Sequence, residues 1–359
     1  MNKITKILLV LVSSLSISVS AIAGELTVTG SAKASYSIGG ESKDANKGFG
    51  ITNEIGLGAT GELDNGFTWS YAIALDPSGI SGTAGSTAGT AVNDDQSLTL
   101  TTPYGTVGMF ITAGGLSTEH GAGIGAVGTG DDLHSTMSPV YGNDISAYQN
   151  VQYHLPAGLL PFGIGAKIGY APNLTNNESY GADFKSPGNQ DLEQYGDSAT
   201  HYQVSAAPIA GLSLQADYFE TTGGTTKGQK PTAGNISAKY TTGPVTVGYR
   251  INYNDPDLAA KDGGITNYEN DAYGVQFAVN DALSISYYVE KHEKRTRAAI
   301  ADEAAKAVKT SVESEVKYIQ AAYNIGGATV GISNADASNS DYTTGLNETA
   351  TMLTFAVAF

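Results

Sequence analysis

Three residues that could perform acyl-transfer chemistry lie close together near the middle of the chain, at Asp131, His134 and Ser135. A carboxylate, an imidazole and a hydroxyl act as a triad only when the fold brings them into one hydrogen-bonded row, so closeness in sequence is weak support. The chain has no Gly-x-Ser-x-Gly motif on a strand-to-helix turn. The Gly-rich segment 121–130 lacks the Gly-Lys-Ser/Thr ending of a phosphate loop. We therefore expect no enzymatic activity and no cofactor.

Two acidic stretches contain the hard oxygen ligands that calcium prefers, Asp94-Asp95 and Asn254-Asp255-Pro256-Asp257. Neither stretch has the ligand spacing of an EF-hand loop. We favour solvated loop carboxylates over a metal site and leave the metal assignment unknown.

The carboxylates follow a clear pattern along the chain, because no Lys or Arg occurs between Lys47 and Lys167. Carboxylates beside a narrow aqueous path favour cations over anions, and a wall of low dielectric constant strengthens their field. Whether such a path exists depends on the elements that carry these residues. The interval contains ten acidic residues, namely Glu54, Glu62, Asp64, Asp76, Asp94, Asp95, Glu119, Asp131, Asp132 and Asp144.

Alternation of apolar and polar residues predicts sixteen β-strands of about ten residues each. The pattern is clearest at 67–75, where large apolar residues such as Tyr71 and Ile73 alternate with small ones such as Ala72. The last stretch, 353–359, places every large residue up to the terminal Phe359 on one face. A soluble sheet buries its apolar face in a core, whereas a transmembrane barrel turns it to lipid and keeps a polar lumen.

The connections between these strands are alternately short and long. Short turns at one end and long loops at the other are typical of outer-membrane barrels. We therefore predict an all-β fold, a closed antiparallel transmembrane β-barrel of about 16 strands formed by residues 24–359 as a single domain. The long connections are 39–47, 77–95, 113–143, 172–199, 221–232, 254–269, 292–312 and 335–348.

Two segments have more specific local predictions. Alternation from Ile145 to Leu155 predicts that the sixth strand spans this whole segment. The run from Ala298 to Lys309 is rich in helix-forming residues, which predicts a short helix in the seventh long loop.

The polar faces of the strands assign charged residues to the lumen. Glu54 alternates toward the lumen with Thr52 and Gly56. The third long connection carries Glu119, Asp131 and Asp132. The basic residues with lumen parity are Lys33, Lys167, Lys239 and Arg250. Because the acidic interval lacks basic residues, we expect a cation-preferring path.

Residues 1–23 have the features of an export signal peptide. Lys3 and Lys6 precede a short apolar run, and Ala21-Ile22-Ala23 fits a cleavage site with small residues. Without those two lysines, 17 of the 19 basic residues remain against 35 acidic ones, a formal charge of −18. This balance argues against nucleic acid as a partner. The absence of cysteine excludes a disulfide framework.

The export signal, the rhythm of short turns and long loops, and the aromatic last strand ending at Phe359 together resemble the general-diffusion porins of Gram-negative bacteria. The Gly- and Tyr-rich, cysteine-free, acidic composition is most similar to the alphaproteobacterial branch. The resemblance covers the whole mature chain. It implies a channel in the cell outer membrane, surrounded by outer-membrane lipid and lipopolysaccharide, through which small hydrophilic solutes diffuse passively.

The family's members are homotrimers whose third loop folds into the lumen and forms a constriction. The resemblance implies that residues 113–143 do the same and bring Glu119, Asp131 and Asp132 to the constriction. This loop lacks the Pro-Glu-Phe-Gly-Gly stretch of the enterobacterial branch. The resemblance also implies that the barrel-assembly machinery reads Phe359. Small outward residues on the first two strands, which would suit contact within a trimer, are Gly30, Ala32, Ala34 and Ala59.

Three functions remain open from the sequence. The first is a passive, cation-preferring diffusion channel, and the second is a substrate-selective porin. The third is a secreted, Gly-rich all-β surface protein or adhesin. Alternation up to the last residue favours a membrane channel, because an adhesin needs no apolar outer face there.

Overall fold

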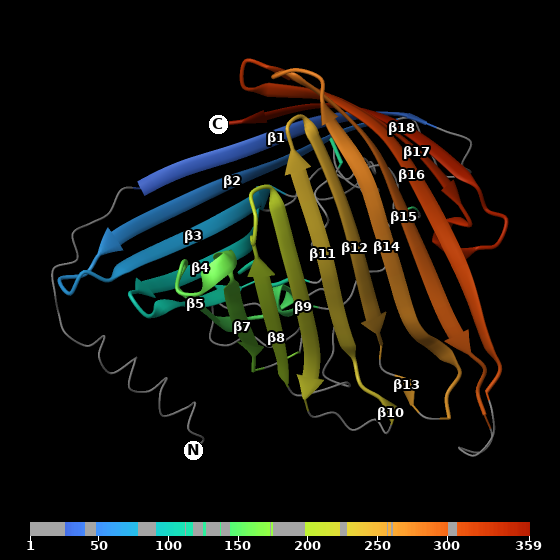
Figure 1. Cartoon of the computed structure of the whole chain (residues 1–359), viewed down its shortest axis with the longest axis horizontal. Coiled ribbons are helices and arrows are strands. Elements are labelled where there is room, and N and C mark those ends of the chain that lie inside the picture. The colour runs from blue at the N-terminus through green and yellow to red at the C-terminus, as the bar shows by residue number, and fades with distance from the viewer. Residues whose placement is uncertain are drawn as a thin grey trace.

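The computed structural model describes residues 26–39, 48–77, 91–111, 113–117, 125–126, 137, 144–172, 174, 198–222, 228–256, 258–259, 261–300 and 307–359 (Figure 1). Sixteen strands in this part of the chain form one closed antiparallel barrel. The predicted fold class and strand number are therefore confirmed. The barrel strands are β1 (Leu26–Gly39), β2 (Gly48–Glu62), β3 (Thr68–Pro77), β4 (Ala91–Thr102), β5 (Gly105–Ile111), β6 (Asn150–His154), β7 (Gly165–Ala171), β8 (Ser198–Ala206), β9 (Leu212–Thr222), β11 (Thr232–Thr242), β12 (Val245–Asp255), β14 (Gly264–Ala278), β15 (Leu283–Arg297), β16 (Lys309–Ile325), β17 (Ala328–Ser338) and β18 (Glu348–Ala358).

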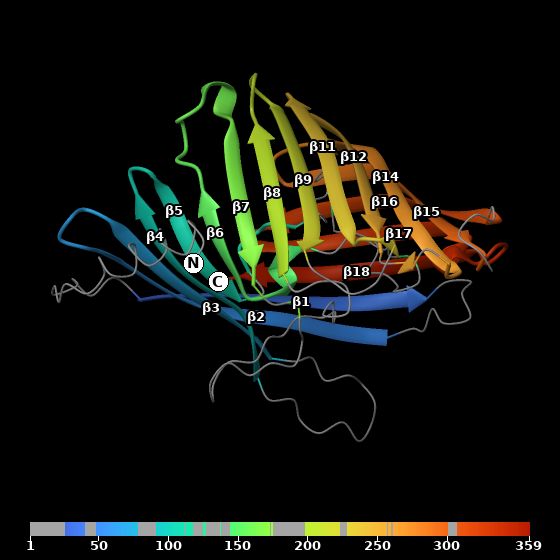
Figure 2. The same cartoon turned by 90° about the horizontal axis from the view of Figure 1, so that it is seen from below.

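The first and last strands close the barrel. β1 and β18 pair antiparallel and lie side by side (Figure 2). Gly30 and Phe359 extend this pairing, since each donates its N–H to the other's carbonyl, at 2.7 and 2.9 Å. Closure leaves no free sheet edge, so the backbone groups of the wall find partners within it. The terminal residue therefore lies in the closing seam.

Consecutive barrel strands are joined alternately by short turns and long connections. The turn after β2 shows how a short connection forms, because Gly66 has a φ of +78° and donates its N–H to the Leu63 carbonyl at 2.8 Å. Glycine adopts this left-handed conformation without steric cost. Six connections at this end have two to five residues, namely 63–67, 103–104, 207–211, 243–244, 279–282 and 326–327. The seventh, 155–164, is longer and contains the 3-10 turn η4 (Pro161–Gly163).

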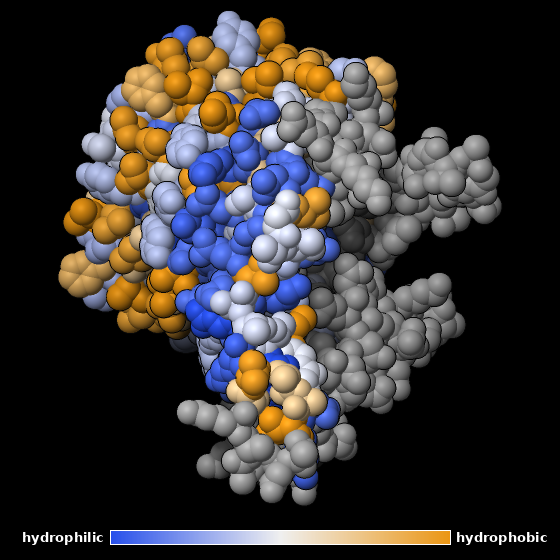
Figure 3. Space-filling model, turned by 90° about the vertical axis from the view of Figure 1, so that its right-hand side faces the viewer, coloured by the Kyte–Doolittle hydropathy of each residue, from blue (hydrophilic) through white to orange (hydrophobic). Residues whose placement is uncertain are grey.

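Large apolar side chains face outward along the wall. On β16, Ile319 and Tyr323 are exposed, whereas Tyr318 and Gln320 on the other face are buried. An apolar exterior around a polar interior is the arrangement of a transmembrane barrel. In Figure 3, hydrophobic residues gather along the left margin of the molecule and hydrophilic ones in its centre.

The sixth strand is shorter than predicted. Ile145–Ala147 forms a 3-10 turn (η3), and β6 begins only at Asn150. The Asn150 amide donates to the carbonyls of Ile145 at 3.1 Å and Tyr148 at 2.9 Å, which holds this turn. The prediction is wrong for 145–149 because these residues pack inside the barrel instead of joining its wall.

The helix predicted at 298–309 does not form at its described ends. The Ala298 N–H donates to the Val308 carbonyl at 2.8 Å, and the pairing of β15 with β16 reaches Arg297 and Lys309. Residues 301–306 lie outside the described residues. Cross-strand hydrogen bonds here override a weak preference for helix.

A small second sheet joins two of the long connections. It consists of β10 (Gly228–Gln229) and β13 (Leu258–Ala259). In the described part of the chain, no helix has the length and hydropathy needed to cross a membrane. The predicted signal peptide, residues 1–23, lies outside the described residues.

Candidate functional site

The third long connection runs from the end of β5 to the start of β6, and its described residues, 113–117, 125–126, 137 and 144–149, pack against the inner wall of the barrel. Leu116, Ile145 and Tyr148 are buried in one apolar cluster with wall residues of β7, β8, β9 and β11. At Gly169 on β7, a Cβ would lie only 2.8 Å from Leu116 Cδ1, so glycine leaves room for the loop. The predicted entry of this loop into the lumen is confirmed at its described residues. The wall residues of the cluster are mostly small: Ala171, Ala199, Phe219 and Ala233.

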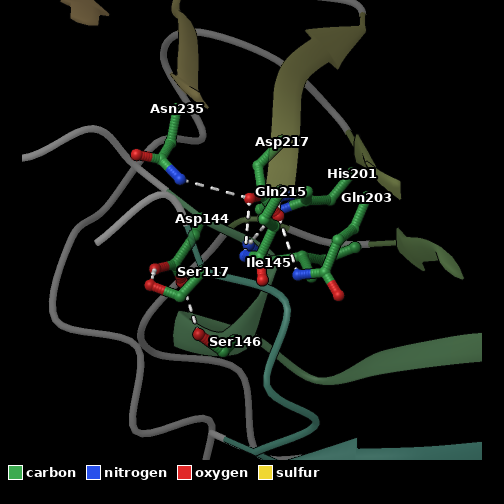
Figure 4. Close-up of polar contacts among 9 residues, drawn as sticks. All are labelled: Ser117, Asp144, Ile145, Ser146, His201, Gln203, Gln215, Asp217 and Asn235. Carbon is green, nitrogen blue, oxygen red and sulfur yellow. Dashed lines mark hydrogen bonds and ion pairs between the residues drawn. The ribbon is translucent and has the colours of Figure 1, made fainter. Parts of the chain in front are cut away.

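Polar contacts fix the base of this connection (Figure 4). Asp144 accepts hydrogen bonds from Ser117 Oγ at 2.7 Å and Ser146 Oγ at 2.6 Å. One carboxylate thus ties the entering and leaving ends of the loop together. The Ile145 N–H lies 3.5 Å from Nδ1 of His201 on β8, which joins the base to the wall.

His201 and Asp217 form a buried pair behind the loop base. The His201 Nε2 lies 3.5 Å from Asp217 Oδ1. Because Nδ1 accepts from Ile145, we assign the proton of the neutral ring to Nε2, toward Asp217. Asp217 also accepts from Gln203 at 2.8 Å and Gln215 at 2.9 Å. Several donors stabilise this buried carboxylate and keep the wall rigid where the loop rests.

The arrangement in Figure 4 is not that of a catalytic triad. A triad needs a hydroxyl bonded to the imidazole, which in turn contacts a carboxylate. Here the hydroxyls of Ser117 and Ser146 donate to Asp144, and the His201 Nδ1 faces a backbone N–H. The cluster therefore supports the loop.

The same connection also contacts the wall formed by β14–β18. The Ala126 N–H donates to Ser286 Oγ on β15 at 2.9 Å. Met137 is buried in a second apolar cluster on these strands. The connection thus spans the interior from β5 to the far strands of the chain. The wall residues of this cluster are Ala272, Tyr288, Val316, Tyr318, Ala335, Ala337 and Ala350.

A buried ion pair lies in the same part of the wall. Arg250 Nη2 on β12 donates to Glu290 Oε1 on β15 at 3.0 Å, and the two side chains are 1% and 0% exposed. Ala272 on the intervening β14 is the register partner of both, and its small side chain lets the guanidinium reach across. The hydroxyls of Tyr288 and Tyr318 also donate to Glu290, at 2.5 and 3.3 Å. Glu290 therefore compensates the charge of Arg250.

The predicted basic and acidic lumen residues of the strands lie in three different surroundings. Glu54 on β2 is exposed and Lys33 on β1 is partly exposed, and their strands are paired neighbours in which Glu54 is opposite Ser31 and Lys33 opposite Thr52. Lys167 on β7 and Lys239 on β11 are half-buried. Arg250 is buried in its ion pair. The structure brings Lys33 and Glu54 onto neighbouring strands and keeps Arg250 apart from them.

The predicted loop carboxylates Glu119, Asp131 and Asp132 lie outside the described residues, so their position at a constriction stays a prediction. His134 and Ser135 of the hydrolase hypothesis lie outside them too.

In the described part of the chain, no three His, Cys, Asp or Glu residues are grouped to hold a metal ion. The metal assignment therefore stays unknown.

The inner wall is covered unevenly. Ser31 on β1 and Glu54 on β2 are exposed on the inner face, whereas Asn252 and Asn254 on β12 are buried there. Among the described residues, the inner faces of the middle and later strands are thus more buried than those of β1 and β2.

A continuous row of polar side chains crosses the inner face of the wall from β7 to β15, and it was not predicted from the sequence. Each member is the register partner of the next, from β7 to β15. The Asn270 amide donates to Asn252 Oδ1 at 3.1 Å within this row. The sequence shows only that each of these strands has a polar residue on its inward face. The strand register is needed to show that these residues lie opposite one another. The row is Lys167, Gln203, Asp217, Asn235, Asn252, Asn270 and His292.

A closed sixteen-strand barrel with a loop folded across its interior has the architecture of a channel. A family model described as Gram-negative porin matches residues 8–341. The chain belongs to the Gram-negative porin family. Family and fold together point to a channel without enzymatic activity, and they place this porin in the outer membrane.

Solved structures of other outer-membrane proteins share the fold of this porin. The loop L8 deletion mutant of OmpT from Vibrio cholerae has a TM-score of 0.61 at 13% identity, over 94% of this chain and 100% of that one. The trimer form of in-vitro folded OmpT has a TM-score of 0.59 at 13% identity, with the same coverage. A mutant of Rh. blastica porin has a TM-score of 0.54 at 14% identity, over 93% and 100% of the two chains. No curated protein matches the sequence.

Proposed function

We propose that this porin forms a water-filled channel for passive diffusion of small hydrophilic solutes and ions. The observation that carries the proposal is the third connection, which crosses the interior at Ala126 and Met137 while Ser31 and Glu54 stay exposed on the inner face. A polar lumen narrowed by a seated loop limits passage by size and charge. The channel needs no cofactor and performs no catalytic step.

The channel prefers cations. Glu54 is exposed on the inner face, and Glu119, Asp131 and Asp132 belong to the loop that enters the barrel. Among the inward basic residues, Arg250 is compensated by Glu290 and buried. Carboxylates facing a narrow lumen raise the local concentration of cations.

Reversal potentials in planar bilayers under a KCl gradient test this preference. We expect K⁺ to permeate better than Cl⁻, and the Asp131→Asn/Asp132→Asn variant to lower the ratio. The matched control is Asp64→Asn/Asp281→Asn, which removes two exposed carboxylates from short turns at the other end of the barrel. The preference should weaken at about 1 M salt, where screening acts over roughly 3 Å. Anion preference in the unmodified channel would refute the field argument.

The porin assembles as a homotrimer through β1, β2 and the closing seam. Outward residues there are small, including Gly30 and Ala59, and large apolar neighbours protrude, with Phe49 88% and Phe359 72% exposed. Exposed apolar side chains beside small ones suit close contact between copies. Native mass spectrometry in mild detergent should show trimers, and monomers alone would argue against this interface.

Residues 1–23 direct export, and the barrel-assembly machinery inserts the chain through its C-terminal strand. Lipopolysaccharide surrounds the outer half, where charged outward residues such as Lys291 and Glu315 form ion pairs above the apolar band. A substrate-selective porin would show saturable conductance for one solute class. A secreted adhesin would lack the shift in gel mobility on boiling that folded barrels show, so that gel separates it from a channel.

A further inference from the structure

The eighth long connection, residues 339–347 between β17 and β18, contains three non-glycine residues in the left-handed conformation. Asn339, Asp341 and Tyr342 have φ angles of +51°, +49° and +54°. Bulky side chains rarely adopt this region, and such strain persists only where surrounding contacts impose it. The contacts of Tyr342 therefore show what the loop is built around.

Tyr342 packs against two inward-facing residues of other strands. Its ring centroid lies 5.6 Å from that of Tyr268 on β14, and Nζ of Lys294 on β15 lies 4.7 Å from the Tyr342 centroid. Tyr268 and Lys294 are register partners, two residues from the buried inward pair Asn270 and His292. Side chains two residues apart share a face, so the Tyr342 ring lies on the lumen side of the wall. It is 8% exposed.

The loop leaves its own hairpin to make these contacts. The Asn339 amide donates to the Glu313 carbonyl on β16 at 2.9 Å, and the loop continues past β15 to β14. With neighbouring strands about 4.8 Å apart, this takes the loop across roughly 14 Å of the wall. Its internal bonds, Ser340 N–H to the Leu346 carbonyl and Gly345 N–H to Asn339 Oδ1, are both 2.8 Å long.

We propose that the eighth connection forms a second narrowing at the outer mouth of the channel, with Tyr342 as the residue that seats it. This deepens the proposed channel function and rests on it. Lys294 lies farther toward the outer end of β15 than Ser286 and Tyr288, which meet the third connection. The two narrowings are therefore successive. Because the Tyr342 ring is buried against Tyr268 and Lys294, the loop residues exposed at the mouth are its neighbours, including Asp341 and Thr343.

Single-channel conductance of the full-length porin tests the inference. We compare the unmodified chain with Tyr342→Ala and with a variant whose residues 339–346 are replaced by an Asn-Gly turn, which suits a two-residue hairpin. The control is Tyr104→Ala, because Tyr104 is 80% exposed in a short turn at the opposite end. Gel mobility before and after boiling identifies the folded barrels.

We expect Tyr342→Ala and the shortened loop to raise the conductance by roughly 1.5-fold, since the narrowest cross-section at the mouth widens. Tyr104→Ala should leave it unchanged. If the shortened-loop variant folds and conducts like the unmodified porin, the eighth connection does not narrow the mouth. If the folded, unmodified porin opens no channel, the proposed function itself fails.

Discussion

Replacing Glu290 by Gln isolates the energetic role of the buried ion pair beneath the third connection. The carboxylate of Glu290 faces the Arg250 guanidinium at 3.0 Å, and both side chains are almost fully buried. An amide keeps the shape of the carboxylate, and its one oxygen can still accept from Tyr288, whereas the NH2 group that replaces the other oxygen cannot accept from Tyr318. The substitution therefore removes the negative charge and leaves a buried, uncompensated guanidinium.

The size of the effect follows from two opposing quantities. At 3.0 Å and an effective dielectric constant of about 20, two unit charges attract by about 5 kcal/mol. Taking both ions out of water costs several kcal/mol each, so the intact pair contributes little net stability. Losing one partner keeps the desolvation cost and forfeits the attraction. Glu290→Gln should therefore lower the free energy of unfolding by about 3–5 kcal/mol.

Reversible urea unfolding of the barrel in lipid vesicles measures this loss. The double variant Arg250→Met/Glu290→Gln removes both charges, so it should recover most of the stability that Glu290→Gln alone loses. The control is Lys291→Gln on the same strand, whose ion pair with Glu315 is partly exposed at 3.4 Å. That change should cost less than about 1 kcal/mol. A loss under about 1 kcal/mol for Glu290→Gln, or a double variant no more stable than the single one, would refute the reasoning.

Three further predictions concern the two faces of the wall, the closing seam and the seat of the third connection. Ile73→Arg, on the lipid face of β3, should lower the free energy of unfolding by about 2–4 kcal/mol in the same assay. Ala72→Arg, on the lumen face, should lower it less and should change the conductance. A larger loss for Ala72→Arg than for Ile73→Arg would mean that the two faces are assigned wrongly. Deleting Phe359 removes the two hydrogen bonds with Gly30 at the seam and should reduce the amount of folded barrel in outer membranes, so normal levels would contradict it. Gly169→Ala places a Cβ 2.8 Å from Leu116 Cδ1 and should cost about 1–3 kcal/mol through overpacking. Gly58→Ala, whose Cβ would have its nearest neighbour at 3.9 Å, should be nearly neutral, and equal costs would argue against a tight seat.

The sequence by itself determined the barrel and the faces of its strands. Alternation is a local property of the chain, because neighbouring side chains point to opposite faces whatever their partners are. That rule predicted sixteen strands, a last strand that runs to Phe359 and the inward parity of Glu54 and Lys33, and the closed topology agrees with the strand number. Long polar stretches between the strands likewise predicted which connections are long.

Tertiary structure decided which inward residues meet and where the loops run. The sequence places Arg250 and Glu290 on the inward face, as it does every other lumen charge. Their pairing depends on the register, which places the small Ala272 of β14 between them. Residues 145–149 alternate like a strand but leave the wall, because Ile145 and Tyr148 find an apolar seat on β7–β11. Tyr342 reaches β14 from a loop that follows β17. Alternation specifies a face, but strand register and loop path depend on contacts between residues far apart in sequence, which no local pattern encodes.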